Sequence, residues 1–150
     1  MSGYEGPGTV LKLYALDGSR TPPAEVTERP VWERVLCALR AAYENGGLVV
    51  LEVVLPKASS IIELRMKAIP GHYKLFVRAQ ASDPLDEFLE WWEPGDSIFR
   101  GNICFGDDEW DARTVCADLR IAENMFHELF ESGSLRLDLQ SMRSLQYWRP

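Results

Sequence analysis

The amino-acid sequence predicts an α+β fold, in which a single, mostly antiparallel sheet carries two main helices packed on it. Two stretches place apolar residues at helical spacing, and several short runs are rich in strand-forming residues or alternate between apolar and polar side chains. Neither an internal repeat nor an interdomain linker interrupts the 150 residues, a length typical of one domain. We therefore expect a flexible N-terminus over residues 1–8 and one α+β domain over residues 9–150.

The first third of the chain predicts a strand, a helix and a second strand. Residues 9–16 are rich in strand formers, and the glycine and prolines that follow end this strand. A helix is expected over residues 30–45, because Pro30 suits a first helical turn and Gly46-Gly47 suits a helix end. The β-branched run 48–55 is typical of a central strand covered on both faces, with a helix over one of them.

A β-hairpin is predicted next, over residues 60–79, with a tight turn at Pro70-Gly71. Apolar and polar residues alternate along its strands, so one face meets the core and the other meets solvent. The solvent face is basic and carries Arg65, Lys67, Lys74 and Arg78.

The segment from Asp83 to Asp111 differs from the rest of the chain in charge. Its ten acidic residues are opposed by Arg100 alone, so it carries −9 in a chain of net charge −7, and the remaining residues carry about +2. Three of the five tryptophans and three phenylalanines lie in it, whereas disordered acidic tails contain few aromatic residues. We expect an ordered, irregular surface with a short helical turn at residues 85–92 and a strand at residues 98–105.

The last third predicts a second helix between two strands. A short strand is expected at residues 113–116, and Asp118 can cap a helix whose apolar residues follow helical spacing until Gly133. Alternation then predicts a late strand at residues 135–139, and Tyr147-Trp148 provide large apolar anchors near the chain end.

Charge and cysteine content limit the compartment and the partners. A net charge of −7 and a sequence pI near 4.9 disfavour binding to nucleic acid or to an anionic membrane, because the electrostatic field of an acidic protein repels negatively charged surfaces. The N-terminus lacks a signal-peptide pattern, and the longest nearly apolar run is too short to cross a bilayer. The three cysteines, Cys37, Cys104 and Cys116, lack CxxC spacing and favour a reducing compartment, so we expect a cytoplasmic protein.

Motifs for catalysis or cofactor binding do not stand out, so we expect no enzyme activity, no cofactor and no bound metal. The chain has two histidines, neither a Gly-rich phosphate loop nor a Gly-x-Ser-x-Gly elbow, and the acidic run Asp107–Asp111 lacks EF-hand spacing. One alternative is a small enzyme that binds a metal through this acidic run, together with His127 or Cys116. A Cys–His dyad is also open, although a buried free cysteine more often acts as a small apolar residue.

The acidic aromatic segment is instead a candidate binding face for a basic protein. Carboxylates steer a basic surface toward the site and aromatic side chains anchor it. Trp91 and Trp92 are adjacent and point in different directions, so one can be core while the other is exposed. Alternatively, both belong to the core and the acids only keep a loop soluble. The candidate partner-binding residues are Glu90, Trp91, Trp92, Glu93, Asp96, Asp107, Asp108, Glu109 and Trp110.

The C-terminal third carries a family resemblance. Thr114-Val-Cys-Ala-Asp118 leads into Ile121-Ala-x-x-Met-Phe-x-Glu-Leu-Phe-Glu-Ser-Gly133, and the chain ends with Leu-Gln-Tyr-Trp148. This arrangement resembles the end of small bacterial immunity proteins encoded beside polymorphic toxins, including nucleic-acid deaminase toxins. The N-terminal half is similar in plan, with a helix, a hydrophobic strand and a Pro-Gly-His-Tyr hairpin. The long acidic insert from Asp83 to Asp111 departs from that pattern and favours a sister family.

The resemblance implies a cytosolic inhibitor that binds a cognate toxin and occludes its basic substrate groove with the acidic aromatic face. The expected partner is that protein toxin, without nucleic acid or membrane, and the protein itself is expected to be a monomer or weak homodimer. A further alternative is an adaptor that dimerises through the hairpin or the terminal strand.

Overall fold

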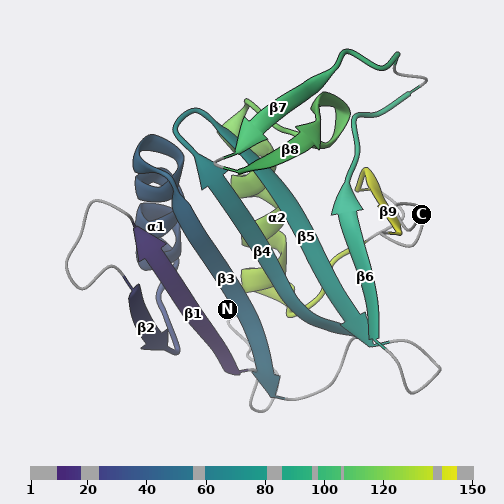
Figure 1. Cartoon of the computed structure of the whole chain (residues 1–150). Helices are drawn as coiled ribbons and strands as arrows, with labels where there is room; N and C mark the ends of the chain where they lie inside the picture. The colour runs from purple at the N-terminus through teal and green to yellow at the C-terminus, as the bar shows by residue number, and fades with distance from the viewer. Residues whose placement is uncertain are drawn as a thin grey trace.

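The computed structural model describes residues 10–17, 24–55, 60–80, 86–95, 98–105, 107–136 and 140–144. Seven strands form one antiparallel sheet in the order β2-β1-β3-β4-β5-β6-β9, and two further strands form a separate hairpin (Figure 1). Together with two helices, this architecture confirms the predicted α+β fold. The N-terminus expected at residues 1–8 and the anchors Tyr147 and Trp148 lie outside the described residues.

The strands have the following bounds. The main sheet contains β1 (Val10–Asp17), β2 (Ala24–Glu28), β3 (Gly47–Leu55), β4 (Ile61–Ile69), β5 (His72–Gln80), β6 (Asp86–Trp91) and β9 (Met142–Ser144). The separate hairpin contains β7 (Asn102–Phe105) and β8 (Asp108–Asp111), and a 3-10 turn over Ala112–Thr114 follows it.

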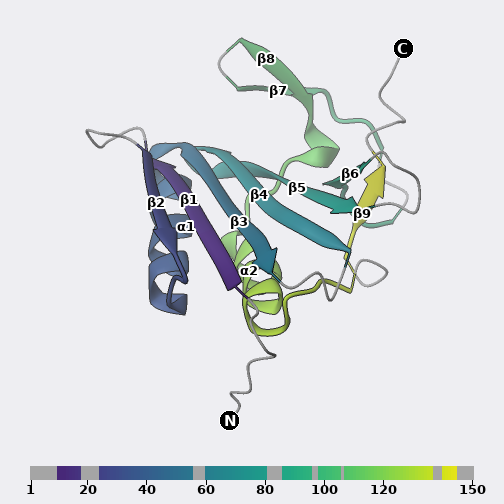
Figure 2. The same cartoon turned by 90° about the horizontal axis from the view of Figure 1, so that it is seen from below.

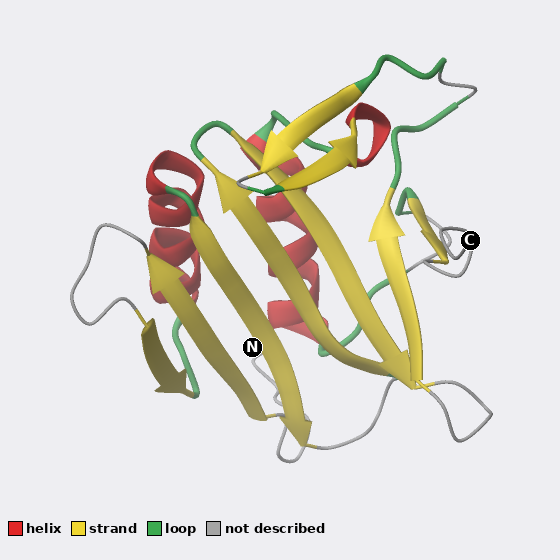
Figure 3. Ribbon diagram, in the orientation of Figure 1, coloured by secondary structure: helices red, strands yellow, loops and turns green. Residues whose placement is uncertain are grey.

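Both helices, α1 (Trp32–Asn45) and α2 (Leu119–Ser132), pack on the same face of the main sheet (Figures 2 and 3). Three of their ends confirm the predicted end residues, whereas α1 begins at Trp32 with Val31 as its N-cap, so Pro30 lies before the helix rather than in its first turn. The Asp118 carboxylate accepts a hydrogen bond from the Arg120 amide at the start of α2, and Gly133 ends that helix with φ 73°. Gly46 ends α1 with φ 83°, a backbone conformation that favours glycine.

The hydrophobic core lies between this face of the sheet and the helices. The strand register aligns one apolar residue from each of β1, β3, β4 and β5 in a row across the sheet. All four side chains in this row are fully buried: Leu13, Leu51, Leu64 and Val77. Leu39 of α1 and Phe126 of α2 are also fully buried in this core. Because side chains alternate along a strand, the intervening residues form the opposite face of the sheet, which we call the open face.

Tyr73 connects the sheet to the start of α2. Its side chain is fully buried, and its hydroxyl donates to the Asp118 carbonyl at 2.6 Å and accepts from the Ala122 amide at 3.1 Å. The Tyr73 backbone also pairs with Cys116 in an isolated antiparallel bridge. This one residue therefore fixes the entry of the chain into α2.

Several sequence-based expectations for local structure are wrong. Residues 86–91 form strand β6 rather than a helical turn, because pairing with β5 places Leu89 and Trp91 on the core side. Residues 113–116 form the end of a 3-10 turn and the single bridge at Cys116 rather than a strand. Tertiary pairing overrides local propensity at both places.

Other differences concern the sheet edges and the second face of β3. Strand β2 follows Pro22-Pro23 in the sequence and differs from the expectation, since its short sequence lacks a clear alternating pattern. Leu135 and Arg136 are not in a strand, and residues 137–139 lie outside the described part; the late strand is β9. The helix over β3 is confirmed, but Leu48 and Glu52 on its other face remain partly exposed.

Replacing Tyr73 with Phe should lower the free energy of unfolding by about 1 to 3 kcal/mol, because the buried Ala122 amide and the part-buried Asp118 carbonyl lose this common partner. The matched control is Tyr43→Phe, which removes a more exposed hydroxyl that donates to the Ala117 carbonyl at 2.6 Å. Urea denaturation measures both, and an equal loss in the two variants would contradict this role for Tyr73.

Candidate functional site

The separate hairpin lies over the open face of the main sheet. We call it the arm and define it as residues 98–105 and 107–111, which include β7 and β8. In Figure 2 the arm and the helices lie on opposite sides of the main sheet. The arm coincides with the second half of the acidic segment that the sequence singled out.

Trp110 attaches the arm to the sheet. Its ring lies 4.6 Å from the Lys74 ammonium and 5.2 Å from the Lys67 ammonium, measured to the ring centroid. Lys67 also lies 3.9 Å from an Asp108 carboxylate oxygen. Cation–π contacts of this kind strengthen when they are shielded from water, so Trp110 fixes the arm across β4 and β5.

A buried ion pair lies on the sheet beside Trp110. The Lys74 ammonium is 2.9 Å from a Glu90 carboxylate oxygen, with side chains 9% and 1% exposed. Lys74 and Glu90 come from neighbouring strands, β5 and β6, on the open face. Glu90 is therefore an interior residue whose charge is balanced within the chain.

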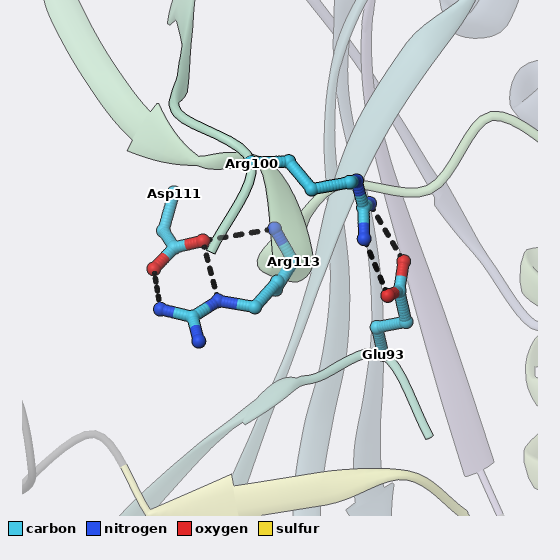
Figure 4. A network of polar contacts seen from close by, with 4 residues as sticks. All are labelled: Glu93, Arg100, Asp111 and Arg113. Carbon is cyan, nitrogen blue, oxygen red and sulfur yellow. Dashed lines mark hydrogen bonds and ion pairs between the residues drawn. The ribbon is translucent and has the colours of Figure 1, made fainter. Parts of the chain in front are cut away.

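Two arginine–carboxylate pairs hold the base of the arm (Figure 4). Both nitrogens of the Arg100 fork donate to the Glu93 carboxylate, at 2.5 and 2.7 Å. Arg113 donates to Asp111 through Nε at 3.0 Å and through a terminal nitrogen at 2.6 Å. These Arg113 hydrogen bonds hold the pKa of the Asp111 carboxyl below its usual range.

Trp92 also lies at the base of the arm, beside a group of arginines that we call the arginine cluster: Arg100, Arg113 and Arg143. The guanidinium carbon of Arg143 is 3.3 Å from the centroid of the Trp92 ring, and that of Arg113 is 4.7 Å away. Trp91 is 8% exposed and belongs to the core on the helix side. The expectation that one adjacent tryptophan is core is confirmed for Trp91, whereas Trp92 is half-buried against two arginines rather than exposed.

The nine predicted partner-binding residues therefore fall into distinct places. Glu90 and Trp91 are buried, so they cannot contribute to an exposed binding face. Trp92 and Glu93 lie in the arginine cluster at the base of the arm, and Trp110 lies against the sheet lysines. Asp107, Asp108 and Glu109 are exposed at the turn of the arm, and Asp96 lies outside the described residues.

The sequence-based reasoning missed the cations that oppose the acidic segment. It found only Arg100 within the segment, but the fold adds Lys67, Lys74, Arg113 and Arg143 from outside it. It also missed Ile98 and Phe99, which precede β7 and are 81% and 56% exposed. Large apolar residues that are exposed beside carboxylates often mark a binding surface, and this pattern could have indicated Ile98 and Phe99.

The histidine and cysteine side chains considered for catalysis have ordinary structural contacts. Burial raises the pKa of the Cys116 thiol to about 12, which disfavours the nucleophilic thiolate. His127 is exposed on α2, where its ring packs edge-on against Trp32 at 4.8 Å. Within the described ranges, no group of three or more His, Cys, Asp or Glu residues is arranged to hold a metal ion. The helices of this part of the chain also include none long and apolar enough to span a membrane.

Replacing either partner of the buried pair alone should be costly. Glu90→Leu or Lys74→Met should each lower the free energy of unfolding by about 3 to 5 kcal/mol, because the remaining charge stays buried and unpaired. The double variant should recover most of that loss in urea denaturation. Additive losses in the double variant would show that the two charges do not depend on each other.

The Asp111–Arg113 pair should make stability sensitive to acid. Since the folded-state pKa of Asp111 is lowered, its contribution is complete at neutral pH and is lost as the pH falls below about 4. Asp111→Asn should cost roughly 1 to 2 kcal/mol at pH 7 and less at pH 3. Urea denaturation at both pH values measures this. The same loss in an Arg113→Gln background would contradict the pairing.

Comparison with known proteins places the chain in a family. It matches the model of a family of unknown function (DUF6911) over residues 13–139, and it belongs to that family. Its fold is similar to the crystal structure of a hypothetical protein from Neisseria gonorrhoeae, with a TM-score of 0.61 and 12% sequence identity over 81% of this chain and 86% of that chain. A search of curated proteins finds no match.

Proposed function

We propose that this member of the DUF6911 family is a cytosolic, immunity-type binding protein that neutralises a cognate toxin by occluding its basic substrate groove. The arm is the contact surface. The observation that carries the proposal is the exposed acidic turn of the arm, formed by Asp107, Asp108 and Glu109, on a hairpin separate from the main sheet.

The arm combines charge with apolar area, as a binding surface for a basic protein requires. Three carboxylates at its turn raise the encounter rate with a basic groove through long-range attraction. Ile98 and Phe99, both largely exposed, can supply the apolar anchors that hold the complex once formed. Glu90 supports this surface indirectly, through its ion pair with Lys74, which contacts Trp110. Trp91 lies in the core on the helix side and does not contribute to it.

The clamped base of the arm reduces the cost of binding. Glu93–Arg100 and Asp111–Arg113 are doubly hydrogen-bonded pairs, and Trp110 rests on two lysines of the sheet. A surface that is already ordered loses less conformational entropy on association. The charges in these pairs are balanced within the chain, so the exposed negative charge of the arm is concentrated at its turn, where Asp107 and Glu109 are exposed and Asp108 lies 3.9 Å from Lys67.

The test uses the protein encoded by the reading frame immediately upstream. Its C-terminal domain should stop growth when expressed alone, and co-expression with this chain should restore growth. The purified pair should form a 1:1 complex whose Kd rises steeply with salt. A triple variant, Asp107→Lys, Asp108→Lys and Glu109→Lys, should raise the Kd at least about tenfold, because repulsion replaces attraction.

The matched control reverses three exposed acids on the helix side of the molecule, Glu33, Glu44 and Glu131, and gives the same net charge. This control should bind as the wild type does. Equal weakening in both triple variants would place the contact elsewhere, and a non-toxic upstream product would overturn the immunity function.

A further inference from the structure

The open face of the main sheet is hollowed into a groove of about 820 Å³. Its charged lining comes from β4 and β5, and its apolar lining comes from β1, β3, β4, β5 and β6. These strands lie side by side in the sheet (Figure 1). None of the lining residues belongs to the arm. The groove is therefore a feature distinct from the surface assigned to the toxin.

The charge of the groove is opposite in sign to that of the protein. Arg65, Lys67 and Arg78 line it together with a single carboxylate, Glu63, in a chain of net charge −7. Arg65 lies 3.1 Å from Glu63 and its side chain is 43% exposed, so it remains accessible to a ligand. Lys67 lies at the end nearest the arm, 3.9 Å from Asp108.

Apolar side chains supply the rest of the groove surface. Leu16 and Leu48 are paired across β1 and β3, and Phe76 stands directly beside Arg65 in the register of β4 and β5. Phe88 of β6 is half exposed, and its ring lies 5.8 Å from the Arg78 guanidinium. Basic groups thus alternate with apolar and aromatic surface across the groove.

The strands that line the groove favour a small ligand over an extended peptide. β1, β3, β4, β5 and β6 are all inner strands of the sheet, so their backbones cannot accept an additional strand along the residues that pair on both sides. The groove offers side chains alone. Its volume also lies within the roughly 300 to 1,000 Å³ typical of sites for small organic molecules.

We propose that this groove binds a small organic anion, in which a carboxylate or sulfonate is joined to an aromatic or aliphatic body. Arg65 and Arg78 meet the anionic group, and Leu48 and Phe76 contact the apolar body. A guanidinium beside a planar acid supports paired hydrogen bonds, which supplies orientation as well as affinity. This site goes beyond the proposed function and does not depend on a toxin partner.

The test compares two probes that share a naphthalene ring, are similar in size and carry opposite charge. Naphthalene-2-carboxylate and 2-naphthylmethylammonium are titrated into the full-length protein by isothermal titration calorimetry. The carboxylate should bind at least about tenfold more tightly, because charge-assisted hydrogen bonds to arginine add to the apolar contact. Equal binding of the two probes, or no binding of the carboxylate at millimolar concentration, would overturn the proposal.

Variants then place the binding in the groove. Arg65→Gln should weaken the carboxylate about tenfold, and Arg65→Lys should restore part of that affinity. The matched control is Arg120→Gln, which removes an equal charge from the exposed start of α2 and should leave the affinity unchanged. Amide chemical-shift changes should concentrate on β3, β4 and β5, and shifts confined to the arm would contradict the assignment.

The experiments also distinguish two other occupants of the groove, an acidic peptide and a second copy of the chain. An acidic hexapeptide that binds while the naphthalene carboxylate does not would overturn the small-molecule proposal. A dimer in sedimentation velocity that dissociates on Arg65→Gln would assign the groove to a second copy of the chain, and would likewise overturn it.

Discussion

Packing of both helices against one face of the main sheet is the constraint on which the other features depend. Alternation along each strand sends one row of side chains into that core and the next row onto the open face. The first set is apolar and fully buried at Leu13, Leu51, Leu64 and Val77. The open face carries the other residues of the same strands, both basic and apolar, and the attachment of the arm and the groove are built from them.

Lysine side chains on the open face connect its two features. Lys74 is buried between Glu90 and the Trp110 ring, so it holds the arm and balances an interior carboxylate at the same time. Lys67 contacts Trp110 and also lines the groove. The arm thus covers one end of the open face and leaves Arg65 and Arg78 in the remaining groove. An acidic projection and a basic recess lie side by side in a protein of net negative charge.

Much of the acidic segment serves the fold. Glu90, Glu93 and Asp111 each have a basic partner, and three of the cations that oppose the segment come from strands β4, β5 and β9. Repulsion among neighbouring carboxylates is relieved by these contacts, which a linear charge count does not reveal. The exposed acidic surface of the arm is the turn at Asp107, Asp108 and Glu109, where Asp108 itself lies 3.9 Å from Lys67, and this surface is smaller than the whole segment.

The sequence by itself determined the two helices, three of their four ends and the β4–β5 hairpin, because helical spacing, Asp118, Gly133 and Pro70-Gly71 act over a few residues. It also determined the basic face of that hairpin, except that Lys74, expected in solvent, is buried. Only the tertiary structure decided that residues 86–91 pair as a strand, that Glu90 is buried and that Trp110 rests on Lys67 and Lys74. Those outcomes arise from contacts between residues far apart in the chain, for which local patterns carry no signal.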